Sequence, residues 1–145
     1  MLSVKIVAVG SIKESFFEEA IAEYEKRLSK YCKFEIIEIK ESDSKNEAIA
    51  IRQKLKGFVM LCDVGGRQVS SVELSDSFFN LGVMGSSTVS IVIGGSHGVG
   101  NCLDDVVDEK ISFGRITFPH QLFRVVLVEQ IYRAFTIIRG EKYHK

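Results

Sequence analysis

The chain has few cysteines, and they lie far apart. Cys32, Cys62 and Cys102 are its only three, and they form no Cys-x-x-Cys pair. This argues against a disulfide framework and fits a reducing compartment. The three histidines are equally scattered, and no cysteine stands near them in a metal-ligand pattern, so we expect no metal site. Cys62 ends an apolar run, where cysteine is more often a small buried residue than a nucleophile.

Long apolar runs are also missing. No stretch of about 20 residues lacks a charge, so no membrane span is expected. The opening MLSVKIVAVG lacks the basic lead of a signal peptide. A chain of 145 residues fits one domain. We therefore expect a single soluble domain, residues 1–145, in the cytoplasm.

The formal net charge is zero, but the charges are distributed unevenly. Residues 110–145 carry seven Lys and Arg against Glu129 and Glu141, a net charge of +5, which leaves −5 on residues 1–109. This asymmetry fits an anionic partner that meets the C-terminal part. A basic helix surface that is merely solvated explains it equally well, so charge leaves both interpretations open.

What the sequence does contain is a regular alternation of β-branched runs and helical stripes. Runs of strand-like residues alternate with segments in which apolar residues recur every three or four positions. Strands are predicted over 2–9, 34–39, 58–64, 88–93 and 111–114, and helices over 14–28, 47–56, 71–81, 102–107 and 121–139. This alternation is typical of an α/β fold: a mostly parallel sheet of about five strands with helices on both faces.

Three loops that follow predicted strands are candidates for a ligand site. They read CDVGGR at 62–67, GGSHGVG at 94–100 and FGRITFPH at 113–120. In parallel sheets, ligands bind where loops leave the carboxyl ends of neighbouring strands. We expect these three loops to meet there.

The second of these, the glycine loop (residues 94–100), has four glycines in seven positions. It lacks the lysine of a P-loop and the third glycine of a dinucleotide fingerprint, and it follows the fourth predicted strand rather than the first. Both phosphate-binding hypotheses, and with them a Rossmann-type oxidoreductase, are therefore disfavoured. A tight turn of small residues explains the loop without a ligand.

The last predicted helix, which follows the only proline, Pro119, is apolar on most of its sides. Such a helix must be covered on more than one side. Arg124, Glu129 and Arg133 within it argue against a membrane span. We expect one face to pack on the sheet and another to meet a second copy of the chain, giving a homodimer.

The charged residues of this helix have two kinds of explanation. Glu129 lies four residues before Arg133, which predicts an ion pair on the helix surface. His120 and Arg124 lie about one turn apart at the helix entrance, where the N-terminus favours an anion. For these two residues, ligand binding and a structural role fit the sequence equally well.

Five motifs occur together in this chain. They are VKIVAVG and AIAEYEKRL near the start, IGGSHG at 93–98, FPHQLFRVVLVEQIYRAFTI at 118–137 and the terminal YHK at 143–145. In combination they resemble the RlmH family of bacterial ribosomal RNA methyltransferases, and the resemblance covers nearly the whole chain. The region between about 40 and 58 looks shorter than in many members of that family.

The resemblance implies a SPOUT-class α/β fold whose C-terminal part passes through a loop to form a trefoil knot, and which dimerises through its C-terminal helices. It also implies S-adenosylmethionine as the cofactor. By position, the cofactor contacts are expected from the ends of the third to fifth strands, many of them through the backbone. They are Cys62, Gly94, Phe113, Gly114, Arg115, Ile116, Thr117 and Phe118.

The family reaction transfers a methyl group to N3 of a pseudouridine in large-subunit (23S) ribosomal RNA, within the assembled ribosome. The resemblance makes Tyr143 and His144 candidates for placing the base or removing its proton, with Arg133 as a third catalytic residue. Arg133, Arg124 and His120 are expected to hold RNA phosphate or a flipped base. The alternative is a non-catalytic RNA- or ribosome-binding module with the same fold, which would not need the cofactor.

Overall fold

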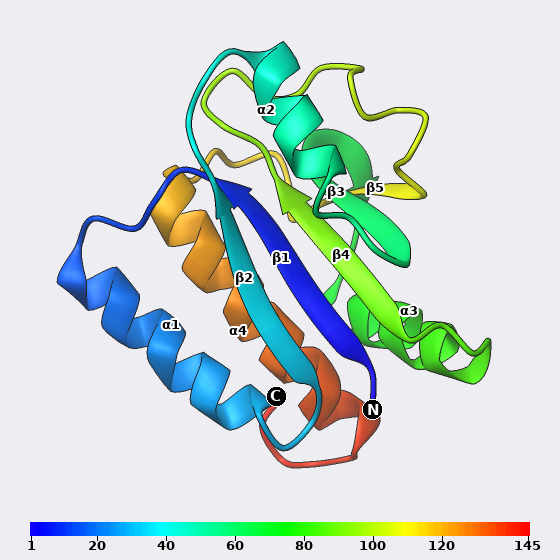
Figure 1. Cartoon of the computed structure of the whole chain (residues 1–145). Helices are drawn as coiled ribbons and strands as arrows, with labels where there is room; N and C mark the ends of the chain where they lie inside the picture. Colours follow the sequence, from blue (N-terminus) through cyan, green and yellow to red (C-terminus); the bar gives the residue numbers. More distant parts are fainter.

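The computed structural model describes residues 1–145 and contains five strands and four helices (Figure 1). The strands are β1 (Ser3–Val9), β2 (Lys33–Ile39), β3 (Phe58–Gln68), β4 (Thr88–Ile93) and β5 (Glu109–Ser112). The helices are α1 (Ser15–Leu28), α2 (Ser44–Arg52), α3 (Ser71–Val83) and α4 (His120–Ile138).

All five strands run parallel in one sheet, in the order β2-β1-β4-β3-β5. This confirms the predicted α/β class and the parallel sheet. The central strand β4 is buried at all six positions, as its continuous apolar sequence indicates. Because parallel strands end at the same edge of a sheet, the loops after β4 and β5 become neighbours, and the bulged part of β3 from Cys62 to Arg67 lies beside them.

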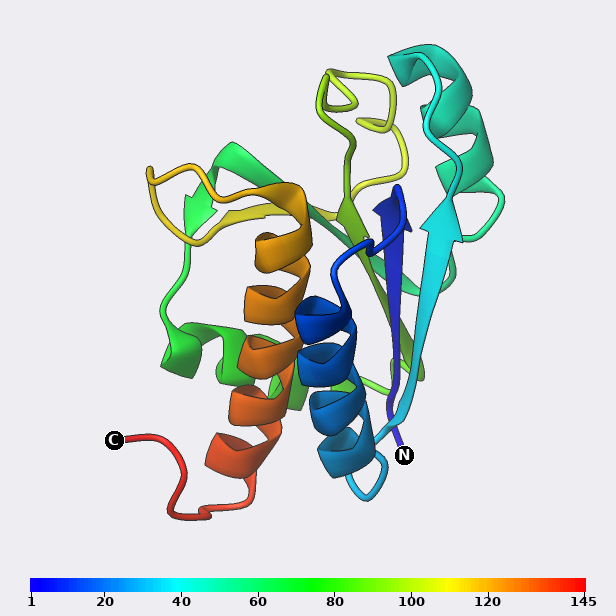
Figure 2. The same ribbon diagram turned by 90° about the vertical axis from the view of Figure 1, so that its left-hand side faces the viewer.

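Alternate residues of the strands face opposite sides of the sheet. Val4, Ile6 and Ala8 of β1 belong to a core shared with α1, α3 and α4, whereas Val7 and Val9 belong to a smaller core shared with α2 and the segment after β4. Figure 2 shows α1 and α4 on one side of the sheet and α2 on the other. Helices therefore cover both faces, as predicted.

Side-chain caps fix where α2 and α3 begin. The Glu73 N–H donates to Ser70 Oγ at 3.1 Å and the Ser70 N–H donates to the Glu73 carboxylate at 2.9 Å, a capping box at the start of α3. The Asn46 N–H donates to the Asp43 carboxylate at 2.8 Å. This N-cap starts α2 at Ser44, three residues earlier than the periodicity predicts.

The predicted end of α2 at residue 56 is wrong, because contacts with the sheet draw the chain away from the helix. Lys5 Nζ of β1 donates to the Lys54 carbonyl at 2.9 Å. Ser90 Oγ of β4 accepts from the Lys56 N–H at 2.9 Å and donates to the Lys56 carbonyl at 2.7 Å. The helix therefore ends at Arg52.

The predicted helix over 102–107 is also wrong, since this segment consists of turns. Arg52 donates to the Cys102 carbonyl at 2.9 Å and to the Asp105 carboxylate at 2.9 and 3.0 Å, which fastens the turns to α2. β3 runs four residues further than predicted, to Gln68, because β5 pairs with both of its halves around a bulge between Cys62 and Arg67.

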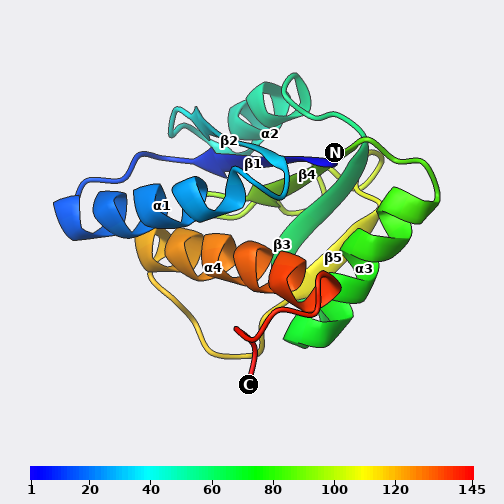
Figure 3. The same cartoon turned by 90° about the horizontal axis from the view of Figure 1, so that it is seen from below.

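The apolar surface of α4 is used largely within the chain. α4 lies between α1 and α3 and against the sheet (Figure 3), and Leu127, Ile131 and Ala134 are fully buried there. Its apolar character therefore does not by itself require a second subunit. No helix here combines the length and the apolar content that a membrane crossing needs. The trefoil knot stays a prediction.

Candidate functional site

A cavity of about 460 Å³ opens at the carboxyl ends of β4 and β5, beside the bulged part of β3. Its walls come from residues 61–64, 93–96, 98–100, 111–114 and 116–118, together with His120 and Phe123 at the start of α4. The two predicted loops after β4 and β5 therefore meet here, whereas the third predicted loop, residues 62–67, is the bulged part of β3 and contributes residues 62–64 to the wall. Half of the lining residues are hydrophobic, which makes a concave and mostly apolar site of the kind that small molecules occupy.

Seven of the eight residues expected to contact a cofactor line this cavity. They are Cys62, Gly94, Phe113, Gly114, Ile116, Thr117 and Phe118. The eighth, Arg115, is exposed and does not line the cavity. His120, expected to contact the substrate, lines the cavity as well.

Few charged groups reach the cavity. Its only titratable side chains are Cys62, Asp63 and His120. Burial raises the pKa of the Cys62 thiol to about 12, so this cysteine is a neutral wall residue and not a thiolate nucleophile. The Asp63 carboxylate accepts a hydrogen bond from the Gly65 N–H at 2.8 Å. This is the local hydrogen bond by which aspartate stabilises a turn.

The glycine loop forms a turn that leaves several donors without a protein partner. The Gly98 N–H donates to the Gly95 carbonyl at 2.9 Å, and Gly98 and Gly100 have φ of +66° and +55°, which glycine adopts without strain. None of the backbone N–H groups from Gly94 to His97 donates to an acceptor in the protein. The loop is therefore both a tight turn and a row of available donors beside the cavity.

A second cluster lies at the other end of α4 and contains the three predicted catalytic residues. Arg133 donates to both carboxylate oxygens of Glu129, at 3.3 and 2.7 Å, which is the ion pair that the spacing predicts. Tyr143 Oη donates to Glu129 Oε2 at 2.7 Å, and the Arg133 guanidinium lies 4.7 Å from the centre of the Tyr143 ring. Burial and the bond to Glu129 raise the pKa of Tyr143, so its hydroxyl stays protonated.

His144 contacts this cluster through one ring nitrogen. Its Nδ1 lies 3.2 Å from a guanidinium nitrogen of Arg133. Because arginine only donates, Nδ1 acts as the acceptor and the proton of the neutral imidazole is on Nε2. In this arrangement the Nε2–H of His144 is available as a donor, and the lone pair on Nδ1 accepts from Arg133.

The tail after α4 is fastened by residues that the sequence analysis did not single out. Tyr31 Oη donates to the Glu141 carboxylate at 2.6 Å, and the Arg139 guanidinium lies 5.0 Å from the centre of the Tyr31 ring. Burial, followed by the bond to Glu141, raises the pKa of Tyr31 to about 12. The YHK motif is therefore held against α4. No local pattern predicts this contact, because its partners are 110 positions apart.

The cavity and the tail cluster do not meet within one chain. His120 and Arg133 are thirteen residues apart on α4, which corresponds to about 20 Å along the helix axis. Figure 2 shows the tail at the opposite end of α4 from the loops that follow β4 and β5. Neither Arg133, Tyr143 nor His144 lines the cavity.

Arg124, expected to contact the substrate, is buried and engaged within the chain. Its guanidinium donates to Glu38 Oε2 at 2.5 Å and to the Gly10 carbonyl at 3.1 Å. Only 6% of its side chain is exposed. It thus joins α4 to the ends of β1 and β2. Across the whole chain, no three His, Cys, Asp or Glu residues are placed to hold a metal ion.

Comparison with known proteins gives matches over the full chain. The family model described as "Predicted SPOUT methyltransferase" matches residues 2–144. The chain is 42% identical to "Ribosomal RNA large subunit methyltransferase H" of Clostridium beijerinckii and 45% identical to the protein of that name in Clostridium botulinum strain Loch Maree. Each alignment spans 159 positions and covers 99% of this chain and 100% of the relative.

Among solved structures, the SpoU methyltransferase AviRb from Streptomyces viridochromogenes aligns with 97% of this chain and 61% of its own, at 10% identity and a TM-score of 0.49. A likeness of this size carries no weight in assigning the family. The full-length family match and the relatives above 40% identity do, and they agree with the motifs that the cavity and the tail contain. The chain belongs to the SPOUT methyltransferase family.

Proposed function

We propose that this chain is an S-adenosylmethionine-dependent methyltransferase that methylates N3 of a pseudouridine in 23S ribosomal RNA, on the assembled large subunit or ribosome in the cytoplasm. Residues 1–145 would form one SPOUT methyltransferase domain. The observation that carries the proposal is the apolar cavity with the glycine loop at its wall, in a chain whose full-length relatives are named ribosomal RNA large subunit methyltransferases.

The residues present fit S-adenosylmethionine. The cavity volume of about 460 Å³ lies within the usual range of roughly 300–1,000 Å³ for small-molecule sites. The free N–H groups from Gly94 to His97 suit polar atoms of a ligand, while Ile111, Phe113 and Phe118 suit its apolar parts. Contacts made through the backbone explain why a small neutral residue such as Cys62 suffices in the wall.

When bound, S-adenosylmethionine supplies an electrophilic methyl group on a positively charged sulfur. The surrounding cavity wall carries few charged groups, and it would exclude water from the reacting atoms. Because the sulfonium charge disappears as the methyl group is transferred, such a wall favours the reaction. Holding the two reactants in line supplies much of the remaining rate enhancement.

The tail cluster would complete the site of a second subunit. Arg133, Tyr143 and His144 are about 20 Å along α4 from the cavity of their own chain, and the tail is fixed in place by Tyr31. Val64 and Ile116 on the cavity rim are 63% and 75% exposed, which leaves apolar surface there for a second copy. We therefore propose a homodimer in which each tail faces the partner's cavity, and a SPOUT-type knot around the glycine loop.

Within that composite site, the tail residues would place the target base. The Nε2–H of His144 and the guanidinium of Arg133 are donors suited to the carbonyl oxygens of a pyrimidine or to phosphate. His144 would accept the N3 proton only after releasing Arg133, so orienting the base is the role that its contacts favour. His120 at the cavity would contact RNA, and Arg124 would act only indirectly, by fixing the start of α4 against the ends of β1 and β2.

Calorimetry with S-adenosylmethionine separates this proposal from the RNA-binding module. Saturable binding to the purified protein is expected, whereas a pure binding module would show none. Mass spectrometry of 23S ribosomal RNA from a strain lacking the gene should show one missing methyl group, restored by the gene. If the strain lacking the gene keeps every methyl group, the proposed reaction is wrong.

Whether the substrate is naked RNA or an assembled ribosomal particle can be tested with the same protein. Because the chain is neutral overall, it can neutralise few phosphates and should bind free RNA weakly. Assembled ribosomes or large subunits are expected to be methylated far faster than naked 23S RNA. Equal rates on both would contradict the assignment of the assembled particle as substrate.

A further inference from the structure

One buried side-chain oxygen in the chain has no hydrogen-bond partner, and it belongs to Glu47 in the first turn of α2. Glu47 is only 3% exposed. Its Oε2 accepts from the Ser42 N–H at 2.8 Å, but its Oε1 has no hydrogen-bond partner, and no other buried side-chain oxygen or nitrogen shares this state. Burying a carboxylate oxygen that accepts no hydrogen bond costs free energy, so the position of this oxygen needs an explanation.

The free oxygen faces the glycine loop. A Cβ at Gly95 would lie 2.9 Å from Glu47 Oε1 and 3.2 Å from Oε2, so the carboxylate rests directly against the Gly95 backbone. Gly95 in turn lines the cavity. Glu47 thus contacts a residue of the cavity wall without lining the cavity itself.

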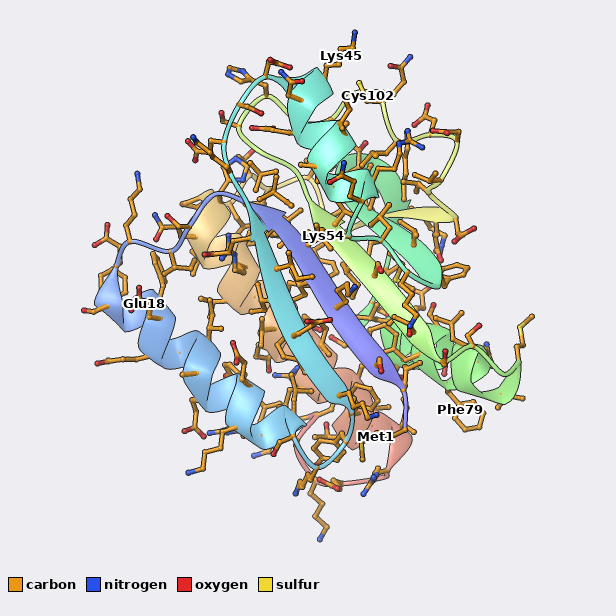
Figure 4. All side chains as sticks on the ribbon, viewed as in Figure 1. Met1, Glu18, Lys45, Lys54, Phe79 and Cys102 are labelled. Atoms are coloured by element: carbon orange, nitrogen blue, oxygen red, sulfur yellow. The ribbon has the colours of Figure 1, made fainter.

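Other contacts of α2 fasten the same loop. Ser44 Oγ donates to the Gly98 carbonyl at 3.0 Å, and Arg52 ties the turns that follow the loop. Figure 4 shows Lys45, on the first turn of α2, and Cys102, after the loop, at the same end of the molecule. Just before these two contacts in the chain, the N–H groups from Gly94 to His97 have no acceptor in the protein, and Glu47 Oε1 has no donor.

We propose that Glu47 is a positioning residue for the glycine loop: once the methyl donor is bound, the free carboxylate oxygen of Glu47 accepts from a backbone N–H of this loop and so fixes the shape in which the loop holds the donor. Ser44 already holds the loop through the Gly98 carbonyl, and Glu47 would hold it through this N–H. The inference rests on the proposed function, because it concerns the same cavity.

Glu47→Gln tests the inference, because it keeps the size of the side chain and removes its charge. Hydrogen bonds to a carboxylate are stronger than those to an amide, so calorimetry should show affinity for S-adenosylmethionine weakened about tenfold. The Michaelis constant for the cofactor should rise by a similar factor, while that for ribosomes stays unchanged. Glu73→Gln is the matched control, because it makes the same change of charge in the capping box of α3, where glutamine also fits, at a residue that does not line the cavity. It should leave cofactor affinity unchanged.

Hydrogen exchange of the loop amides distinguishes positioning from a merely structural role. In the wild-type protein, the amides of residues 94–97 should exchange more slowly when S-adenosylmethionine is present, and Glu47→Gln should remove that protection. Equal cofactor affinity in Glu47→Gln and wild type would overturn the inference alone. Unprotected loop amides in the liganded wild type would overturn the inference together with the proposed backbone contacts to the cofactor, but not the methyltransferase activity. A wild-type protein that does not bind S-adenosylmethionine would overturn the proposed function and this inference with it.

Discussion

The two ends of α4 are built in different ways. At its N-terminal end, the cavity is shaped by glycines and apolar side chains, and the polar groups it offers are largely backbone N–H groups. At its C-terminal end, Glu129, Arg133, Tyr143 and His144 form a cluster of side-chain hydrogen bonds that continues to Tyr31 through the tail. The N-terminal end of α4 thus borders a shaped, mostly apolar cavity, and the C-terminal end carries side-chain donors and acceptors.

This difference predicts which substitutions each end tolerates. A site formed by backbone groups should tolerate changes in side-chain chemistry, but it should not tolerate a larger residue in place of a glycine. A site formed by side-chain hydrogen bonds should tolerate changes in side-chain size at its edges, but it should not tolerate the loss of a donor or an acceptor. The four predictions below test this contrast, from the largest expected effect to the smallest.

His144→Ala should have the largest effect, and only on turnover. Loss of a group that orients a reacting base can cost about 100-fold in rate, so kcat on ribosomes should fall by about that factor. Cofactor affinity should stay unchanged, because His144 does not line the cavity of its own chain. Single-turnover methylation and calorimetry measure the two quantities. Lys142→Ala, at an exposed tail position, is the control and should keep kcat. Unchanged turnover in His144→Ala would reject any chemical role.

Gly95→Ala should damage the cavity end through size alone. The added Cβ would lie 2.9 Å from Glu47 Oε1 and 3.0 Å from Val9 Cγ1, both in closely packed surroundings. We expect a loss of about 1–3 kcal/mol in the free energy of unfolding, together with weaker cofactor binding. Gly82→Ala in α3 is the control, since its Cβ would meet nothing within 4 Å. Denaturant unfolding that finds both variants equally stable would contradict the close packing behind the glycine loop.

Arg124→Met should lower stability because this guanidinium joins α4 to the ends of β1 and β2. Only 6% of the Arg124 side chain is exposed, against 45% for its partner Glu38, which water can solvate again when the pair is broken. A loss of about 1–3 kcal/mol in the free energy of unfolding is expected. Arg52→Met breaks an ion pair whose partners are 40% and 69% exposed, and should cost less. If Arg124→Met instead raises only the Michaelis constant for ribosomes, direct RNA contact is its main role.

Tyr31→Phe should have the smallest effect, confined to the tail. Losing the hydroxyl that donates to Glu141 should reduce the free energy of unfolding by about 1 kcal/mol and speed hydrogen exchange of residues 141–145. Lys30→Ala removes only a cation near the Tyr31 ring and keeps the hydrogen bond, so it should leave the tail protected.

The same tyrosine gives a dependence on pH. Its pKa is raised from 10.0 to about 12, so the unfolded chain loses this proton first as the pH rises. The stabilisation is complete below pH 10 and is lost as the pH approaches 12. Ultraviolet titration should show one fewer late-ionising tyrosine in Tyr31→Phe than in the wild type. An unchanged number would contradict the raised pKa.

The strands, their parallel arrangement and the loops at their ends were predictable because they depend on short-range patterns. β4 is a six-residue apolar run that reads as buried on both faces, and α3 begins where Ser70 and Glu73 form a capping box. Most of the cavity residues were predictable as well, because carboxyl ends of parallel strands meet and because the motifs at 93–98 and 118–137 resemble those of a family. Where the chain is held by distant partners, as at residues 54–56 and 102–107, local periodicity gave the wrong helix boundaries.

By itself the sequence determined the α/β class, the position of the ligand loops and the Glu129–Arg133 pair, since each follows from residues within a few positions of one another. Only the tertiary structure decided that Arg124 is buried against Glu38, that Tyr31 holds the tail through Glu141, and that Glu47 lies against Gly95. These contacts join positions about 50 to 110 apart in the chain. Periodicity carries no information over such separations, because it is folding around two cores that brings these side chains together.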